Sequence, residues 1–155
     1  MPSHWLIVSN NGHALHHMLR NDNGSWQGSW GNVLSQHGAP DAGAITSATF
    51  HTDLSGDLHV CVLTSLHNIW HTIRSAAGPW TPWGNVNFNS LGLPAGTVAA
   101  LASSVSGDNT FQLFALTPTV IYHTLRQPNG HWQSSWGNVN NKATPPLPVD
   151  LLGGG

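Results

Sequence analysis

Charged side chains are scarce in this sequence. They make up 6% of its 155 residues, with no glutamate and a formal net charge of −2, whereas roughly 25% is usual in soluble domains. The four cations are Arg20, Arg74, Arg126 and Lys142. Nucleic-acid binding needs a basic patch that neutralises phosphates, and anionic membrane surfaces attract polybasic segments. Four scattered cations supply neither, so we expect no nucleic-acid partner and no anionic membrane contact.

Long apolar runs and cysteine pairs are missing as well. No stretch approaches the roughly 20 apolar residues that span a bilayer, so we expect no membrane insertion. The N-terminal segment has no basic region and only a short apolar run, which is unlike a signal peptide. Cys61 is the single cysteine, which excludes an internal disulfide and a cysteine-based zinc site. Cytoplasmic synthesis is the default expectation, and release by another route stays open.

Glycine, proline and tryptophan are abundant, and they recur in register. The segments 15–33, 69–86 and 121–139 share the pattern H-x-[LI]-R-x3-G-x-W-x2,3-W-G-N-V. The glycines near its end, Gly31, Gly84 and Gly137, are each 53 residues apart. All three arginines and six of the eight tryptophans occupy equivalent positions. Such recurrence identifies an internal repeat of about fifty residues.

The segments between these copies predict β-hairpins. Residues 43–65 and 96–118 each hold two runs rich in apolar and β-branched residues, around Ser-Gly-Asp at 55–57 and 106–108. The strand that carries His and Arg, and the stretch between the tryptophans, bring the total to four short strands per period. No segment has a convincing 3.6-residue apolar period. Four strands in a repeat of about 40–50 residues is typical of a propeller blade, so we predict an all-β fold of the β-propeller class.

The phase of the repeat predicts how the blades are divided. Residues 3–10 match the second strand of the later copies, and Leu151 stands where Ile45 and Val98 begin a first strand. We expect one domain over 1–155, with a partial blade at approximately 1–44, blades at 45–97 and 98–139, and a tail at 140–155. The tail would complete a blade of a neighbouring chain.

Three blades are too few for a ring, because known propellers have about four or more. Open ends would expose unpaired strand edges and apolar faces, which proteins usually cover. The sequence therefore predicts a homo-oligomer that closes head to tail. A trimer with nine blades is favoured, and a dimer with six blades is the alternative.

The repeat resembles that of bacterial propeller lectins of the Photorhabdus type. Its arginines, glycines and tryptophan pairs carry the resemblance, which covers essentially the whole chain. The resemblance implies non-enzymatic binding of glycans with fucose- or galactose-type sugars, in several shallow pockets between blades, with no cofactor. Those lectins have seven blades in one chain, and this chain departs from them in blade count. The second copy also shortens the tryptophan spacing, with Pro82 inside it, which leaves the sugar identity open.

Arginine shares a strand face with an aromatic side chain in the later copies. Because side chains alternate along a strand, Trp70 lies on the face of Arg74, and Tyr122 on that of Arg126. An aromatic ring can stack on the apolar face of a pyranose, while a guanidinium donates several hydrogen bonds to hydroxyls. The candidate sugar-binding residues are the arginines, these two rings and the repeat tryptophans: Arg20, Arg74, Arg126, Trp70, Tyr122, Trp26, Trp80, Trp132, Trp30, Trp83 and Trp136.

A packing role competes with this interpretation. We expect the six repeat tryptophans to form mainly core, and His17, His71 and His123 to be structural, because they lie between aliphatic residues on one strand face. The arginines are the better functional candidates, since buried arginine is rare unless paired and six aspartates are the only carboxylate side chains. The alternative function is a structural or engineered self-assembling propeller that binds no ligand.

Catalytic and metal chemistry find little support in the sequence. Glycoside hydrolysis normally uses two opposed carboxylates, yet the aspartates fall in turns and loops without a repeated partner: Asp22, Asp41, Asp53, Asp57 and Asp108. We therefore expect no enzyme.

His13, His16 and His17 cluster in sequence, but the last two point to opposite strand faces and no carboxylate or thiol joins them. We expect no metal site.

Overall fold

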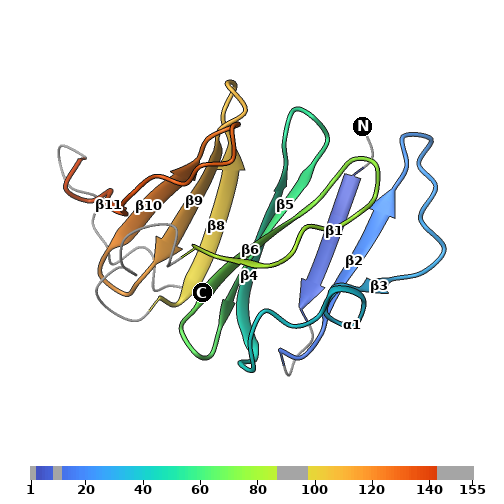
Figure 1. The fold of residues 1–155 in the computed structure, drawn as a ribbon, viewed down its shortest axis with the longest axis horizontal. Coiled ribbons are helices and arrows are strands. Elements are labelled where there is room, and N and C mark those ends of the chain that lie inside the picture. Colours follow the sequence, from blue (N-terminus) through green and yellow to red (C-terminus); the bar gives the residue numbers. More distant parts are fainter. Residues whose placement is uncertain (1–2, 9–11, 87–97, 143–155) are drawn as a thin grey trace.

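The computed structural model of this chain describes residues 3–8, 12–86 and 98–142. In these ranges the strands form three antiparallel sheets, which lie side by side in Figure 1 with the second sheet in the middle. The first sheet has the order β1-β2-β3, the second β4-β5-β6-β7 and the third β8-β9-β10-β11. Their bounds are β1 Ser3–Val8, β2 Leu15–Arg20, β3 Gly31–Asn32, β4 Ile45–Thr52, β5 Leu58–Thr64, β6 Ile69–Arg74, β7 Gly84–Asn85, β8 Ala100–Val105, β9 Phe111–Leu116, β10 Ile121–Arg126 and β11 Gly137–Asn138.

The predicted all-β class and the four strands per period are confirmed in the second and third sheets. Strand β1 pairs with β2 as β5 pairs with β6, so it occupies the position of a second strand, as its sequence predicts. The first strand expected at Leu151 falls outside the described residues. One element was not predicted, the five-residue helix α1 (Val33–His37), which begins where the Asn32 side chain accepts a hydrogen bond from the Leu34 N–H. No described helix is long and apolar enough to cross a membrane.

Both predicted hairpins form, but their turns differ in register. In the β4–β5 turn Gly56 has a φ of 87°, and in the β8–β9 turn Asn109 takes the same role with a φ of 66°. Asn is one of the few residues other than Gly that tolerate this left-handed region. The two Ser-Gly-Asp triplets therefore occupy different positions in their turns, although their sequences are identical.

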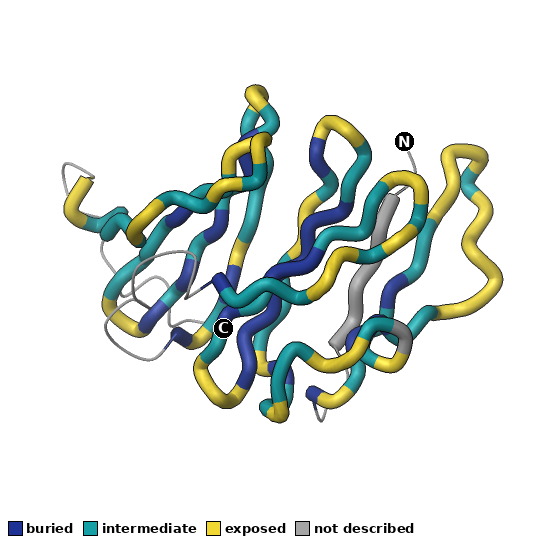
Figure 2. The backbone as a smooth tube through the Cα atoms, viewed as in Figure 1, coloured by how far each residue is buried: buried dark blue, intermediate teal, exposed yellow. Residues whose placement is uncertain are grey.

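Strand β5 separates two apolar cores. All its residues are buried, and because side chains alternate, Leu58, Val60 and Val62 pack toward the first sheet. Cys61 and Leu63 pack toward the third sheet. Figure 2 shows buried backbone concentrated along the strands of the middle sheet. The second sheet thus has an apolar core on each of its faces, one shared with the first sheet and one with the third.

Polar contacts fix how the second and third sheets lie against each other. The hydroxyls of Thr49 on β4 and Ser103 on β8 are 2.8 Å apart. The Leu101 N–H donates to the Ser47 hydroxyl at 3.0 Å. Buried polar groups need such partners, so these bonds favour one alignment of the two strands and hence one arrangement of the side chains between the sheets.

Candidate functional site

A tight turn follows each repeat arginine and returns the chain to a tryptophan. Arg126 ends β10, the Gly130 N–H donates to the Gln127 carbonyl at 2.9 Å, and Arg126 forms a backbone bridge with Trp132. The same turn follows the other two arginines, with bridges from Arg20 to Trp26 and from Arg74 to Trp80.

The glycine of each turn lies under the guanidinium of its own arginine. Gly24, Gly78 and Gly130 have φ values of 83°, 116° and 93°, which disfavour residues with a Cβ. A Cβ on Gly130 would lie 3.2 Å from Nη2 of Arg126. The repeated glycine therefore permits the turn and leaves room for the guanidinium.

A cavity of about 330 Å³ opens between the second and third sheets. Arg126 and Trp132 line it from the third sheet, and His71 on β6 lines it from the second. The remaining lining residues are Pro82, Gly84, Gly130 and His131. Two residues that the sequence analysis nominated, Arg126 and Trp132, are thus brought together with a histidine that it had assigned to structure.

Aromatic rings form one wall of this junction. His71 meets Trp132 edge to face, with ring centroids 5.4 Å apart at 88°. Phe111 on β9 stacks on His59 of β5 at 4.7 Å. Edge-to-face and offset-stacked rings are the favoured arrangements of aromatic pairs. Trp132 therefore contributes to packing as well as to the cavity.

Behind the cavity, His59 and His71 form a buried hydrogen-bonded pair, with Nδ1 of His59 3.0 Å from Nε2 of His71. Nε2 of His59 is 3.6 Å from the Asp53 carboxylate. The pKa of His59 is lowered to about 4 by burial and, to a smaller extent, by the Arg126 charge, against the opposing effect of Asp53 and Asp57. Burial, His59 and Arg126 hold the pKa of His71 well below its usual value. Both imidazoles are therefore neutral at pH 7.

The carboxylate selects the tautomers of this pair. It favours a proton on Nε2 of His59, which leaves Nδ1 of His59 as an acceptor. Nε2 of His71 then donates to it, and Nδ1 of His71 is left as an acceptor. Neutral His71 therefore keeps one ring nitrogen that can act as an acceptor.

Arg126 has an electrostatic partner that the sequence analysis did not find. Burial lowers the pKa of its guanidinium, and the Asp53 carboxylate opposes this. Arg126 also lines a second cavity of about 140 Å³, together with Asp53, Asp57 and His59. Asp53, which belongs to the neighbouring sheet, thus lies close enough to Arg126 for its charge to act on the guanidinium.

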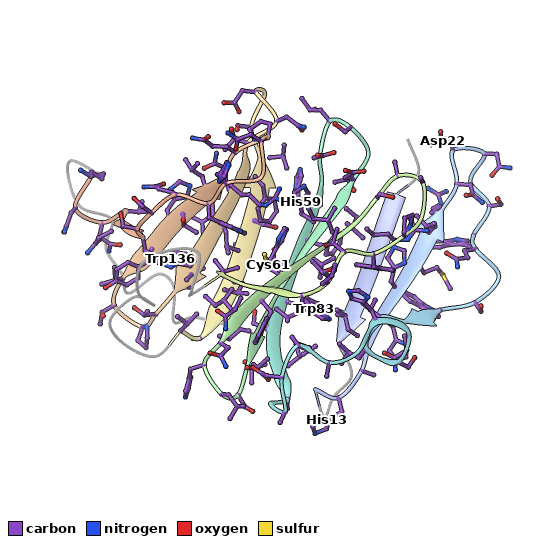
Figure 3. The ribbon with its side chains drawn as sticks, in the orientation of Figure 1. His13, Asp22, His59, Cys61, Trp83 and Trp136 are labelled. Carbon is purple, nitrogen blue, oxygen red and sulfur yellow. The ribbon has the colours of Figure 1, made fainter. Side chains whose placement is uncertain are left out.

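The junction of the first and second sheets repeats the histidine–tryptophan contact. His17 on β2 meets Trp80 edge to face at 5.8 Å and 87°. Arg74, whose pKa is lowered by burial, precedes the turn to Trp80. Trp83 donates its indole N–H to the Gly38 carbonyl at 3.0 Å, and Figure 3 shows Trp83 between the first and second sheets. Trp80 and Trp83 pack on the apolar core there.

Trp70 and Tyr122 lie away from the arginines of their strands. Trp70 packs on the first core and donates its indole N–H to Asp41 at 2.8 Å. It is four residues from Arg74, which corresponds to about 13 Å along a strand. Tyr122 packs against the second core in the same way. Each arginine is instead bridged through its backbone to the tryptophan across the turn.

The expectation that the repeat tryptophans are mainly core holds for four of the six. Trp80, Trp83, Trp132 and Trp136 pack against buried clusters. Trp26 and Trp30, on the first sheet, are 48% and 41% exposed. These two remain exposed because no described sheet packs on their side of the first sheet. The guanidinium of Arg20 lies 5.9 Å from the Trp26 ring.

The aspartates act mainly as acceptors for nearby backbone and side-chain donors. Asp53 accepts from the N–H groups of Ser55 and Asp57, and Asp108 from that of Thr110. Asp41 binds four donors, which outweigh the effect of burial and leave its pKa lowered. Among residues 3–8, 12–86 and 98–142, no three His, Cys, Asp or Glu side chains gather as a metal site.

Another cavity, of about 400 Å³, lies beside Asp41 among the loops after β1, β3 and α1. None of the nominated residues lines it. At the arginine cavity, sequence reasoning missed His131 and Gly130 as lining residues and gave His71 a structural role only. A histidine stands at the position of His71 in all three copies, and this recurrence was the available signal. It does not distinguish a packing role from a binding role.

Comparison with solved structures relates this fold to AofleA from Arthrobotrys oligospora, in a variant with three arginines replaced by alanine. The TM-score is 0.53 at 14% sequence identity, over 88% of this chain. The chain spans 38% of the length of that protein. At this identity the likeness concerns the fold alone. No protein-family model matches the sequence, and no curated protein does.

Proposed function

We propose that this chain is a non-enzymatic carbohydrate-binding protein that holds sugars between neighbouring β-sheets, each sheet being a blade of a propeller. One observation carries the proposal: Arg126, Trp132 and His71 line a single cavity of about 330 Å³ at a sheet junction. Its volume lies at the lower end of the roughly 300–1,000 Å³ found for ligand sites. That size suits a small ligand such as a monosaccharide.

The chemistry of the three side chains suits a neutral polyol. The guanidinium of Arg126 donates hydrogen bonds in a fixed planar geometry, neutral His71 can accept one, and Trp132 offers an apolar ring. Each hydrogen bond contributes only about 1 kcal/mol net. A single site would bind weakly, and avidity for glycans would come from several sites acting together.

Recurrence supports a set of equivalent sites. The first junction brings Arg74, Trp80 and His17 into the same relation, with nearly the same ring geometry as His71 and Trp132. The solved structure whose fold is similar to this one is a variant of AofleA. Its three replaced arginines stand 53 residues apart, the interval that separates Gly31, Gly84 and Gly137 here. Both observations direct attention to the repeat arginines.

The sugar class comes from the resemblance to Photorhabdus-type lectins, which favours fucose- or galactose-type ligands. The test is a calorimetric titration with methyl α-L-fucoside and methyl β-D-galactoside, alongside a glycan array. Binding should weaken when Arg126→Ala removes the donor or His71→Ala removes the acceptor. Lys142→Ala, which removes a cation from an exposed position outside the cavity, is the matched control and should bind as the wild type does.

Two results would count against the proposal. Binding that survives the combined replacement of Arg20, Arg74 and Arg126 by alanine would place the sugar elsewhere. Absence of binding to every glycan on the array would favour the other candidate, a structural propeller whose tryptophan–histidine contacts serve only to pack the sheets.

A further inference from the structure

The two sheet junctions of this chain are built from the same parts. In each, a histidine from one sheet meets a tryptophan from the next edge to face, His17 with Trp80 and His71 with Trp132. Both histidines are 6% exposed. The same histidine–tryptophan contact thus packs neighbouring sheets together at both junctions.

A third set of these parts lies on the two outer faces of the row of sheets. His123 on β10 has Gln112 as its hydrogen-bond partner, just as His71 has His59. His123 is half-buried, in contrast to its two buried counterparts. At the other end of the row, Trp26 is 48% exposed beside Arg20, which is also exposed.

These outer residues match the cavity between the second and third sheets position by position. His123 and Gly137 stand where His71 and Gly84 line that cavity from the preceding sheet. Arg20, Gly24 and Trp26 stand where Arg126, Gly130 and Trp132 line it from the following sheet. Each outer face therefore carries one half of the same site.

We propose that the third sheet of one copy packs on the first sheet of a second copy, and that this interface forms a further sugar site. His123 of one copy would contribute the acceptor, and Arg20 and Trp26 of the other the donor and the ring. The sugar part rests on the proposed function, whereas the packing part does not.

The occupant is a second copy because the two faces are complementary to each other and neither is complementary to itself. In the internal junctions a face with a histidine packs on a face with a tryptophan, so the face with His123 is complementary to the face with Trp26. Trp26 and Trp30 together expose a large aromatic surface there, of the kind that marks association sites. With 6% charged residues, little like-charge repulsion opposes contact. Such a head-to-tail interface closes into a ring if its rotation permits.

The test is native mass measured by sedimentation or native mass spectrometry. The wild-type chain of 16.5 kDa should form a multimer. Trp26→Asp on one face, and Leu125→Asp on the face of His123, should each give monomers with an unchanged circular dichroism spectrum. Leu66→Asp, at a position that is 55% exposed in the turn between β5 and β6 of the second sheet, is the control and should leave the multimer intact.

Mixing the two monomeric variants makes the test specific. The third sheet of the Trp26→Asp copy and the first sheet of the Leu125→Asp copy are both intact, so the mixture should form a two-chain species and nothing larger. A monomeric wild type, variants that still assemble, or a mixture that stays monomeric would overturn the proposal.

Sugar stoichiometry separates this inference from the proposed function. Methyl α-L-fucoside or methyl β-D-galactoside should bind the wild-type multimer with one more site per chain than it binds the Trp26→Asp monomer. If neither glycoside binds while the masses behave as stated, the proposed function fails and the interface stands. If both proteins bind with equal stoichiometry, the shared site is refuted.

Discussion

Lowering the pH from 7 to 5 should destabilise the fold through the buried pair of His59 and His71. The pKa of His59 is about 4 in the folded chain, against 6.5 for an unperturbed histidine. Below pH 6.5 the unfolded chain therefore binds a proton that the folded chain does not. Because the unfolded state binds more protons, the free energy of unfolding falls with pH from about 6.5 down to about 4.

The magnitude follows from this difference in pKa. At pH 5 an unfolded imidazole is almost fully protonated and folded His59 is mostly neutral. At about 1.4 kcal/mol per pKa unit, His59 alone should remove about 2 kcal/mol from the free energy of unfolding at that pH. His71 shifts in the same direction and adds to the loss. Carboxylates titrate mainly below this range, so pH 5 isolates the histidines.

The third sheet provides the matched variant. Gln112 bonds His123 there as His59 bonds His71, so His59→Gln should keep the hydrogen bond and remove the titrating group. We expect its loss of unfolding free energy between pH 7 and 5 to be smaller than that of the wild type by about 2 kcal/mol.

Urea unfolding followed by tryptophan fluorescence measures this, at fixed protein concentration because assembly would change apparent stability. His51→Gln, at an exposed position on β4, controls for the loss of a histidine as such and should behave like the wild type. An equal loss in the wild type and in His59→Gln would refute the assignment to this pair.

Three further predictions concern the turn, the loop anchor and the thiol. Gly130→Ala should cost about 1–3 kcal/mol of stability and displace Arg126, weakening sugar binding, whereas Gly107→Ala, which faces open space, should change neither in chemical denaturation or calorimetry. Asp41→Ala leaves an indole, a hydroxyl, an amide and a backbone N–H without their acceptor and should cost about 2 kcal/mol or more by thermal unfolding. Cys61 is fully buried and its thiol pKa is raised by burial, so alkylation by iodoacetamide should track unfolding; rapid modification of the native protein would contradict that burial.

The strands could be predicted because their signals are local. Alternating apolar residues and turn residues mark both hairpins, and the repeat assigns β1 to a second-strand position before any partner strand is known. Helix α1 could not be predicted, because five residues are too few to establish a helical period. The register of the β8–β9 turn was not predicted either. Asn109 has the positive φ there, although Gly107, two residues earlier, is the residue type that usually adopts it.

The site was harder to predict because its parts meet across sheets. Alternation along β10 correctly places Tyr122 and Arg126 on one face, but it does not say which lies near a cavity. Trp132 reaches Arg126 through a turn, and His71 comes from another repeat. The position of Asp53 close to Arg126 was not predicted, because it depends on how two sheets pack. Strand periodicity carries no information on that packing.

Around the repeat arginines some residues are the same in every copy and others differ, and the two groups serve different purposes. The arginine, the turn glycine and the tryptophan are the same in all three copies, which is expected of parts that every junction needs. Pro82 and His131, which line the described cavity, are replaced by serine at the corresponding Ser135 and Ser25. Such replacements change the shape and the hydrogen-bonding capacity of a cavity while leaving the arginine, glycine and tryptophan in place. Differences in sugar preference between the sites should therefore trace to these variable residues, and exchanging Pro82 for serine should alter selectivity without abolishing binding.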